Sequence, residues 1–170
     1  MSALFEIKKS KIAGKGVFAI KKIKKGQTIC FLNGELCTLD EMIKRVDEGK
    51  EKGSDPLGIE DETYLDLDEI SRTFNHSCSQ NAFIRGKNEL IALKDIKIGE
   101  EITYDYSTTM NDNEEKIKKD GGGLWTCKCH CSSKNCRGII DQFKTLPKKT
   151  QNFYIKNKFA PDFILRHFSE

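Results

Sequence analysis

Long apolar runs are missing from this chain of 170 residues. No uninterrupted apolar stretch approaches the roughly 18 residues that would suggest a membrane-spanning helix. The opening residues, from Met1 to Lys9, also lack the charged-then-apolar order of a secretory signal peptide. These absences predict a cytoplasmic protein with no membrane partner, or one that reaches a host cell or a nucleus without a cleaved signal.

An excess of one charge is missing too, because 29 Lys and Arg residues face 26 Asp and Glu residues, giving a formal charge of +3. A nucleic-acid footprint would gather basic residues on one face. Here acidic residues interleave with the lysines, which favours a solvated surface and predicts no direct nucleic-acid binding. Internal repeats are also lacking, and a hydrophobic content of 37% is enough for one core.

Cysteine is present in an odd number, seven. Cys127, Cys129 and Cys131 alternate with single residues, and Cys136 follows. Neighbouring C-x-C cysteines are poor disulfide partners, and a reducing compartment keeps thiols free, so the cluster favours a metal site. Zn²⁺ prefers four tetrahedral thiolate or imidazole ligands. Because Cys127 repeats the spacing, the ligand set can slide by two residues; His130 fits a surface residue better than a ligand.

The backbone pattern predicts short strands joined by tight turns. Asn33-Gly34 is a strong hairpin signal between predicted strands 28–32 and 35–38, and a second hairpin is predicted for 82–85 and 89–93. One helix is expected to start after Thr38, since apolar residues then recur at helical spacing and Glu41 completes a capping box. A strand is expected over 102–106, a loop over 51–58, and two short helices in the last thirty residues.

Three motifs occur in an order that is informative as a set. Gly14-Lys15-Gly16-Val17-Phe18-Ala19 comes first, Arg72 to Asn81 contains Asn75-His76-Ser77-Cys78, and Gly99 to Tyr106 ends in Thr-Tyr-Asp-Tyr. With the cysteine run and the Arg-Gly that follows Cys136, the chain resembles the SET-domain protein lysine methyltransferases. The resemblance covers most of the chain, from Gly14 to about Ile140, and the tail is similar to that of small, prokaryote-type single-domain members.

The resemblance implies a mainly β fold of small curved sheets. It has a C-terminal pseudoknot beneath the Asn75-His76 stretch, a post-SET zinc segment and short C-terminal helices. The chain then divides into a SET domain over 4–110, a flexible loop over 111–123, the zinc segment over 124–140 and a helical extension over 141–170. The sequence also allows a short helix around Ile117 within that loop.

The family pattern supplies the zinc ligands as Cys129, Cys131 and Cys136, with Cys78 as the fourth. One position departs from this pattern, because Gln80 stands where proline is usual. Proline would stiffen the turn after Cys78, so the departure bears on the local geometry and on Cys78 as a ligand.

The resemblance also implies that S-adenosylmethionine is the methyl donor. The predicted cofactor-binding residues are Lys15, Gly16, Val17, Arg72, Asn75, His76, Tyr106 and Trp125. Two of these have alternatives: Arg72 holds the cofactor carboxylate or a backbone carbonyl, or is a surface arginine, and Trp125 either stacks on adenine or packs the tail. Glycine allows close backbone approach to a ligand, but a lone Gly-x-Gly is more often an ordinary turn.

Tyr106, Tyr104 and Tyr64 are the predicted catalytic residues. Tyr106 matches the tyrosine that orients the methyl group and the amine. A tyrosine at 104, where the family has Phe or Tyr, crowds the amine and predicts mainly monomethylation, with dimethylation next. Tyr64 either lines the lysine channel or is a half-buried strand residue. Glu100 and Glu101 are expected to be structural rather than an acid–base pair.

The predicted function is S-adenosylmethionine-dependent methylation of a lysine in a histone or non-histone protein. Two alternatives stay open: a catalytically silent SET-fold binding module, and a zinc-stabilised interaction domain without a cofactor. The pattern leaves the substrate and the oligomeric state undetermined.

Overall fold

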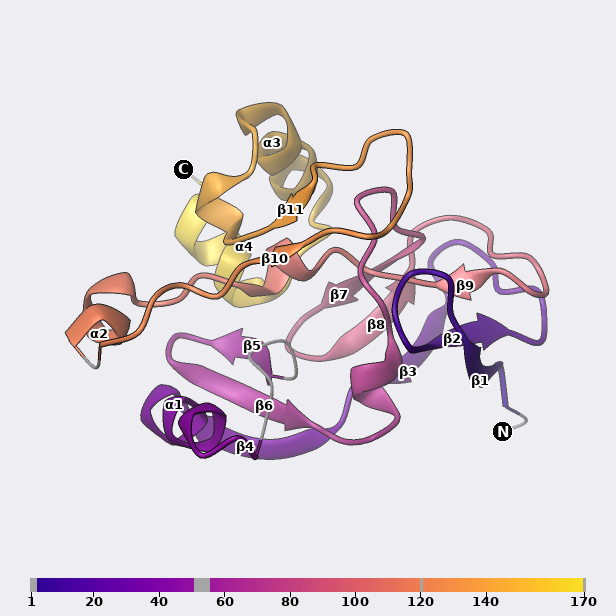
Figure 1. Ribbon diagram of the computed structural model, residues 1–170. Coiled ribbons are helices and arrows are strands. Elements are labelled where there is room, and N and C mark those ends of the chain that lie inside the picture. The colour runs from indigo at the N-terminus through magenta and orange to yellow at the C-terminus, as the bar shows by residue number, and fades with distance from the viewer. Residues whose placement is uncertain (1–2, 51–55, 120, 170) are drawn as a thin grey trace.

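The computed structural model describes residues 3–50, 56–119 and 121–169, and these form a mainly β protein of small antiparallel sheets (Figure 1). Three sheets have three strands, in the orders β1-β2-β9, β3-β8-β7 and β4-β6-β5, and one has the two strands β10-β11. The strands are β1 (Phe5–Lys9), β2 (Lys15–Ala19), β3 (Thr28–Phe31), β4 (Gly34–Thr38), β5 (Pro56–Glu60), β6 (Thr63–Leu67), β7 (Ala82–Arg85), β8 (Glu89–Ala92), β9 (Glu101–Ile102), β10 (Cys127–Lys128) and β11 (Ile139–Ile140).

Short helices join and cover these sheets. The α-helices are α1 (Leu39–Asp47), α2 (Glu114–Lys119), α3 (Lys148–Asn157) and α4 (Asp162–Phe168), and the 3₁₀ helices are η1 (Ser71–Thr73), η2 (Tyr106–Thr109) and η3 (Phe143–Thr145). In Figure 1, α1 lies along the β4-β6-β5 sheet, while α3 and α4 gather near the strands β10 and β11. No described helix combines the length and the apolar character that a membrane crossing needs.

The core has two parts. The larger one joins the inner faces of the three-stranded sheets around fully buried side chains such as Val17, Leu32 and Ile102. The smaller one lies within the C-terminal segment, where Phe143, Tyr154 and Ile164 pack together. The predicted pair of C-terminal helices is therefore confirmed, and it has an apolar cluster of its own.

Helix α1 begins where the sequence predicts. The Thr38 side chain accepts a hydrogen bond from the backbone N–H of Glu41 at 3.3 Å, which satisfies one of the free donors at a helix start. The chain leaves the helix at Gly49, whose φ of 68° lies in the left-handed region that glycine adopts without strain.

The predicted hairpin at Asn33-Gly34 is wrong. β3 pairs with β8 and β4 pairs with β6, so the two predicted partners belong to different sheets. Gly34 is also not among the glycines with positive φ that a type I′ turn requires. A Cβ at Gly34 would overlap the backbone carbonyl of Asp66, so the glycine serves the close approach of β4 to β6. The hairpin of β7 and β8 is confirmed.

Three other segments differ from expectation. The predicted strand 102–106 ends at Ile102, because Tyr106 opens η2 instead. Residues 56–58 belong to β5 rather than to a loop, and the rest of that predicted loop, 51–55, lies outside the described residues. Within 111–123, the structure has the short helix that the sequence allows, with Ile117 buried.

Two segments far apart in sequence meet beside the sheets. His76 and Tyr104 form an isolated parallel bridge. The backbone N–H of Tyr104 donates to the carbonyl oxygen of Asn75 at 3.3 Å, and the N–H of Ser77 donates to the carbonyl oxygen of Tyr104 at 3.1 Å. The Asn75-His76 stretch and the Thr-Tyr-Asp-Tyr stretch are therefore held side by side, which puts the predicted site residues at one place.

Candidate active site and metal centre

Asn75 ties the glycine turn to the centre of the molecule. Its side-chain NH₂ group donates to the carbonyl oxygen of Lys15 at 3.0 Å and lies 3.3 Å from that of Ala13. It also donates to the Glu101 carboxylate at 2.7 Å. These hydrogen bonds fix the turn after β1, and the space that a Cβ at Gly14 would occupy is open.

Gly16 is small for a reason that the sequence does not reveal. A Cβ there would overlap Glu101 Oε1 and approach the Asn75 amide, so the missing side chain makes room for these protein groups. The single O–H of Ser10 also donates to the Glu101 carboxylate, whose two oxygens lie 2.8 and 2.9 Å from the Ser10 Oγ. This carboxylate therefore holds the glycine turn, as a structural role predicts. The Val17 side chain points into the core and is fully buried, so only its backbone faces the turn.

Tyr106 points its hydroxyl at the same corner. The hydroxyl donates to the carbonyl oxygen of Phe74 at 2.7 Å, one residue before Asn75. Its backbone N–H donates to His76 Nδ1 at 3.1 Å, and the two rings meet edge to face with centroids 5.5 Å apart. The phenol and the Asn75-His76 pair, separated by about thirty positions in the chain, thus form one unit.

His76 links this corner to the cysteines. Burial lowers the pKa of His76 to about 4, against the opposing effect of Asp105. A neutral ring carries one N–H, and because Nδ1 accepts from the Tyr106 backbone, the network assigns that proton to Nε2. Nε2 lies 3.3 Å from the sulfur of Cys78. The ring therefore bridges the tyrosine backbone on one side and a candidate metal ligand on the other.

Tyr104 lies beneath Tyr106 and is 5% exposed, with the ring centroids 4.9 Å apart. Burial raises the pKa of Tyr104, and the neighbouring Tyr106 raises it further. Its phenol therefore stays neutral at physiological pH and is able to donate a hydrogen bond.

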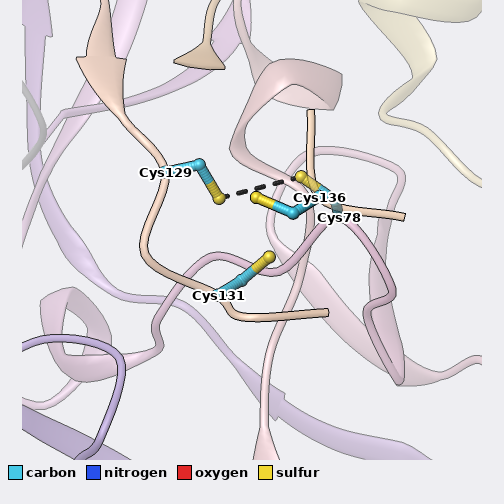
Figure 2. Close-up of side chains that lie close together, drawn as sticks. All are labelled: Cys78, Cys129, Cys131 and Cys136. Carbon is cyan, nitrogen blue, oxygen red and sulfur yellow. Dashed lines mark hydrogen bonds between the residues drawn. The ribbon is translucent and has the colours of Figure 1, made fainter. Parts of the chain in front are cut away.

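Four thiols converge at the end of this corner, as Figure 2 shows. The sulfurs of Cys78, Cys129, Cys131 and Cys136 all lie within 4.8 Å of one another. Four sulfurs around tetrahedral zinc at Zn–S of about 2.3 Å are separated by about 3.8 Å, and the Cys78–Cys129 distance is 3.8 Å. The donor set therefore fits a zinc ion in both chemistry and spacing.

The thiols of the cluster differ in the direction of their pKa shifts, and burial raises the pKa of Cys78. Burial raises the pKa of Cys129, while for Cys131 the hydrogen bonds of Ser133 and its neighbours outweigh burial and lower the pKa to about 6. Cys127 is not in the set of four; it lies in β10 opposite Ile140. The alternative register with Cys127 is therefore not the one the fold adopts.

A family model for the SET domain matches residues 14–107, which contain the glycine turn, the Asn75-His76 pair and Tyr106. The chain belongs to the SET-domain family. Among solved structures, the methyltransferase domain of human SETMAR superposes with a TM-score of 0.65 at 24% identity, covering 84% of this chain and 59% of that one. At that identity the likeness shows the fold: a mainly β SET domain.

Curated relatives of this SET domain include the variant-silencing SET domain-containing protein of Plasmodium falciparum, 34% identical over 77% of this chain and 5% of that protein. The H3 lysine-9 specific histone-lysine N-methyltransferase of Schizosaccharomyces pombe is 32% identical over 79% of this chain and 32% of its own length. The chain thus spans a minor part of the length of these relatives.

An apolar cleft of about 330 Å³ opens on another side of the SET domain, between α1 and the segment 121–125. Its described lining includes Leu39, Met42, Tyr64 and Trp125. Tyr64 is half-buried, donates to Asp112 Oδ1 at 2.6 Å, and has a pKa that burial raises. Thr109 also lines the cleft. The sequence predicts no function for this residue, but it is the last residue of η2 and so connects the cleft to the helix that begins at Tyr106.

Two predicted cofactor residues have described contacts with other parts of the chain. Arg72 donates to the carbonyl oxygen of Leu67 at 2.8 Å and pairs with the Asp66 carboxylate. The first of these contacts is the one expected if Arg72 holds a backbone carbonyl. Trp125 lines the apolar cleft, and none of the described lining residues belongs to the glycine turn or to Asn75-His76. Stacking of Trp125 on adenine stays a prediction.

The residue that sequence reasoning missed is Asp105, between the two tyrosines. It is 1% exposed and lies 3.4 Å from His76 Nδ1. Arg137 donates to its Oδ1 at 2.7 Å, which joins the cysteine segment to the Thr-Tyr-Asp-Tyr stretch. Two sequence signals were available: the position of Asp105 between two candidate site tyrosines, and the Arg-Gly after Cys136. Neither signal identifies Arg137 as the partner of Asp105.

Proposed function

We propose that this SET domain transfers a methyl group from S-adenosylmethionine to a lysine amine of a protein substrate. The observation that carries the proposal is the meeting of Tyr106 with the Asn75-His76 corner, through the 2.7 Å bond from its hydroxyl to the Phe74 carbonyl. S-adenosylmethionine, when bound, supplies an electrophilic methyl group on a sulfonium. Carbonyl and phenol oxygens are suitable neighbours for such a cation, and the corner gathers both kinds.

The glycine turn and the asparagine corner are the proposed donor side. Lys15, Gly16 and the Val17 backbone present the turn that Asn75 and Glu101 fix, while His76 holds the backbone of Tyr106. Because these groups are bonded before any ligand arrives, little reorganisation is needed at the moment of reaction. The fixed phenol of Tyr106 then orients the incoming amine.

The acceptor amine must lose its proton to react. A free lysine has a pKa of about 10.4, so its neutral form is scarce at pH 7. Burial beside the rings of Tyr104 and Tyr106, next to a sulfonium, disfavours the ammonium form and lowers that pKa. Alignment of the two reacting groups in this narrow space supplies the rest of the rate enhancement.

The test is mass spectrometry of candidate histone and non-histone proteins after incubation with cofactor, for wild type and for Tyr106→Phe. Loss of the positioning hydroxyl should slow transfer by about 10²-fold or more. Lysines of the enzyme itself are scored separately, since automethylation would otherwise mimic activity. Equal rates for both proteins on the same lysine would exclude the assignment of Tyr106.

Product state is proposed to depend on Tyr104. Its buried phenol crowds the amine and favours monomethylation, with dimethylation as the next product. Tyr104→Phe removes only the oxygen, so the products should shift toward higher methylation of the same lysine. A product distribution identical to wild type would count against this role.

The apolar cleft is the proposed place for the substrate segment beside the lysine. Tyr64 and Trp125 line it, and α1 supplies much of its apolar wall. An extended segment that also pairs with a sheet edge would gain affinity from backbone bonds and selectivity from such a hollow.

We further propose structural zinc at the four thiols. Metal content per chain should be close to one equivalent in wild type and be lost in Cys131→Ser. Cys127→Ser is the matched control, because it removes a neighbouring thiol outside the cluster and should keep the metal. Loss of metal in both variants, or in neither, would contradict the ligand set.

The two rival functions predict different binding. A zinc-stabilised interaction domain should give no heat with S-adenosylhomocysteine in isothermal titration, whereas a silent SET-fold module would bind it and transfer nothing. The intact Tyr106, Asn75 and His76 favour the enzyme over both.

A further inference from the structure

Three buried polar side chains and one half-buried side chain, from distant segments, form one chain of contacts behind the candidate site. The Gln80 amide donates to the Tyr154 hydroxyl at 2.8 Å, and that hydroxyl donates to Asp105 Oδ2 at 2.6 Å. Asp105 Oδ1 accepts from Arg137 at 2.7 Å. Gln80, Tyr154 and Asp105 are 7%, 2% and 1% exposed, while the Arg137 side chain is 16% exposed, so the chain of contacts is buried except at its Arg137 end. We call these residues the Asp105 relay.

Asp105 is the point at which this relay reaches the site. It lies between Tyr104 and Tyr106 in the sequence. Its Oδ1 also accepts a hydrogen bond from the backbone N–H of Ser107 at 3.1 Å, and this bond caps the start of η2. Tyr106 is the first residue of that one-turn helix, and its backbone binds His76. Any shift of the Asp105 carboxylate therefore moves the start of η2 and the phenol that it carries.

The Tyr154 hydroxyl both donates and accepts in this relay. Removing it would leave a buried amide hydrogen on Gln80 and a buried lone pair on Asp105 without their partner. Networks of this kind, when fully satisfied, hold one arrangement of the groups they join. Arg137 fixes one oxygen of Asp105 and Tyr154 fixes the other, so the two together set the carboxylate plane.

We propose that helix α3 is a positioning element for methyl transfer, with Tyr154 acting through Asp105 on Tyr106. This inference rests on the proposed function and adds the C-terminal extension to it. Tyr154 belongs to the small C-terminal core, beside Phe143. The extension therefore completes the site from behind, rather than only covering the sheets.

The role of Gln80 follows from the same geometry. Proline, which the family pattern has at this position, has no side-chain donor to offer. Gln80 replaces the stiffness of proline with a hydrogen bond across 74 positions of the chain, to Tyr154. The departure from the pattern therefore gives this turn a hydrogen bond to α3, and the Cys78 turn next to it keeps its sulfur in the cluster.

The test is the kinetics of full-length, zinc-loaded Tyr154→Phe. The substitution keeps the ring and its packing, so the chain should remain folded. We expect kcat to fall by about tenfold, because reacting groups lose alignment, while KM for the protein substrate changes less than twofold. Gln80→Leu should lower kcat in the same direction and by less, and the double variant should lose less than the product of the two single losses.

Gln151→Met is the matched control for a purely structural effect. Gln151 lies in the same helix, is 2% exposed, and donates to the carbonyl oxygens of Lys144 and Leu146 at 3.0 and 2.9 Å. None of its described hydrogen bonds goes to a member of the Asp105 relay. Its loss should lower the melting temperature at least as much as Tyr154→Phe, with kcat within twofold of wild type. An equal fall of kcat in both variants, or none in Tyr154→Phe, overturns the proposal.

Amide hydrogen exchange tests the coupling of α3 to η2 independently of methyl-transfer activity. Tyr154→Phe should raise exchange within 103–109, whereas Gln151→Met should raise it only within 141–168. Identical exchange patterns for the two variants contradict the inference even if wild type transfers methyl. Conversely, a wild type without transfer and with the expected exchange difference would reject the proposed function and keep the coupling of α3 to η2.

Discussion

Two acidic residues anchor the C-terminal segment to the SET domain, and they do so in different surroundings. Asp105 is fully buried and meets a guanidinium, a phenol and a histidine ring. Asp112 is half-buried and accepts from Tyr64 at 2.6 Å and from the Gln142 amide at 2.8 Å, while its own N–H donates to Gln142 at 2.8 Å. The first carboxylate has a cation as a partner, whereas the described hydrogen-bond partners of the second are neutral.

This difference in surroundings explains how the C-terminal segment can contact both the Asp105 relay and the apolar cleft. A buried carboxylate is stable only when it is paired and hydrogen-bonded, so the Asp105 relay is rigid by necessity. Asp112 is near the apolar cleft, where partial hydration reduces the cost of an imperfect partner. We therefore expect changes at Asp105 to affect stability and turnover, and changes at Asp112 to affect substrate binding.

Asp105→Asn should have the largest effect. It leaves the Arg137 guanidinium, whose side chain is 16% exposed, without its countercharge. Breaking one side of a buried pair costs about 3–5 kcal/mol. Urea unfolding of the zinc-loaded protein measures the loss. A loss no greater than that of Asp112→Asn would remove the distinction between the two acids.

Asp112→Asn should cost less, about 1–2 kcal/mol, because an amide oxygen can still accept from Tyr64 or Gln142. Its main effect should be a higher KM for the protein substrate at nearly unchanged kcat, since the cleft wall moves while Tyr106 stays in place. Steady-state kinetics separates the two constants. A fall in kcat that matches that of Tyr154→Phe would contradict the separate roles.

Tyr64→Phe is expected to have the smallest effect on stability, about 0.5–1.5 kcal/mol for one lost hydrogen bond. The ring still lines the cleft, so substrate binding should weaken less than in Asp112→Asn. If the phenol touches the lysine, turnover should fall as well. Comparing kcat of Tyr64→Phe with that of Tyr106→Phe under saturating substrate distinguishes a wall residue from a residue that orients the amine.

The places where sequence reasoning succeeded share a physical character. The α1 start, the β7–β8 hairpin and the cysteine set depend on residues within a few positions of one another, or on a motif whose spacing carries the chemistry. The prediction of a hairpin at Asn33-Gly34 was wrong because a glycine also suits a position where one strand lies very close to its neighbour. Local preference there was weaker than the pairing of β4 with β6.

By itself, the sequence predicted the family and, through the family resemblance, the mainly β class, the four thiols and the meeting of Tyr106 with Asn75 and His76, because the motifs that carry the resemblance are short runs of residue types. Only the tertiary structure decided that Glu101 fills the space beneath Gly16, that Trp125 faces the apolar cleft, and that Gln80 and Tyr154 join at Asp105. The hydrogen bonds from Gln80 to Tyr154 and from Tyr154 to Asp105 cross 74 and 49 positions of the chain. A hydrogen bond over such a separation leaves no spacing to read, because the fold alone brings its donor and acceptor together.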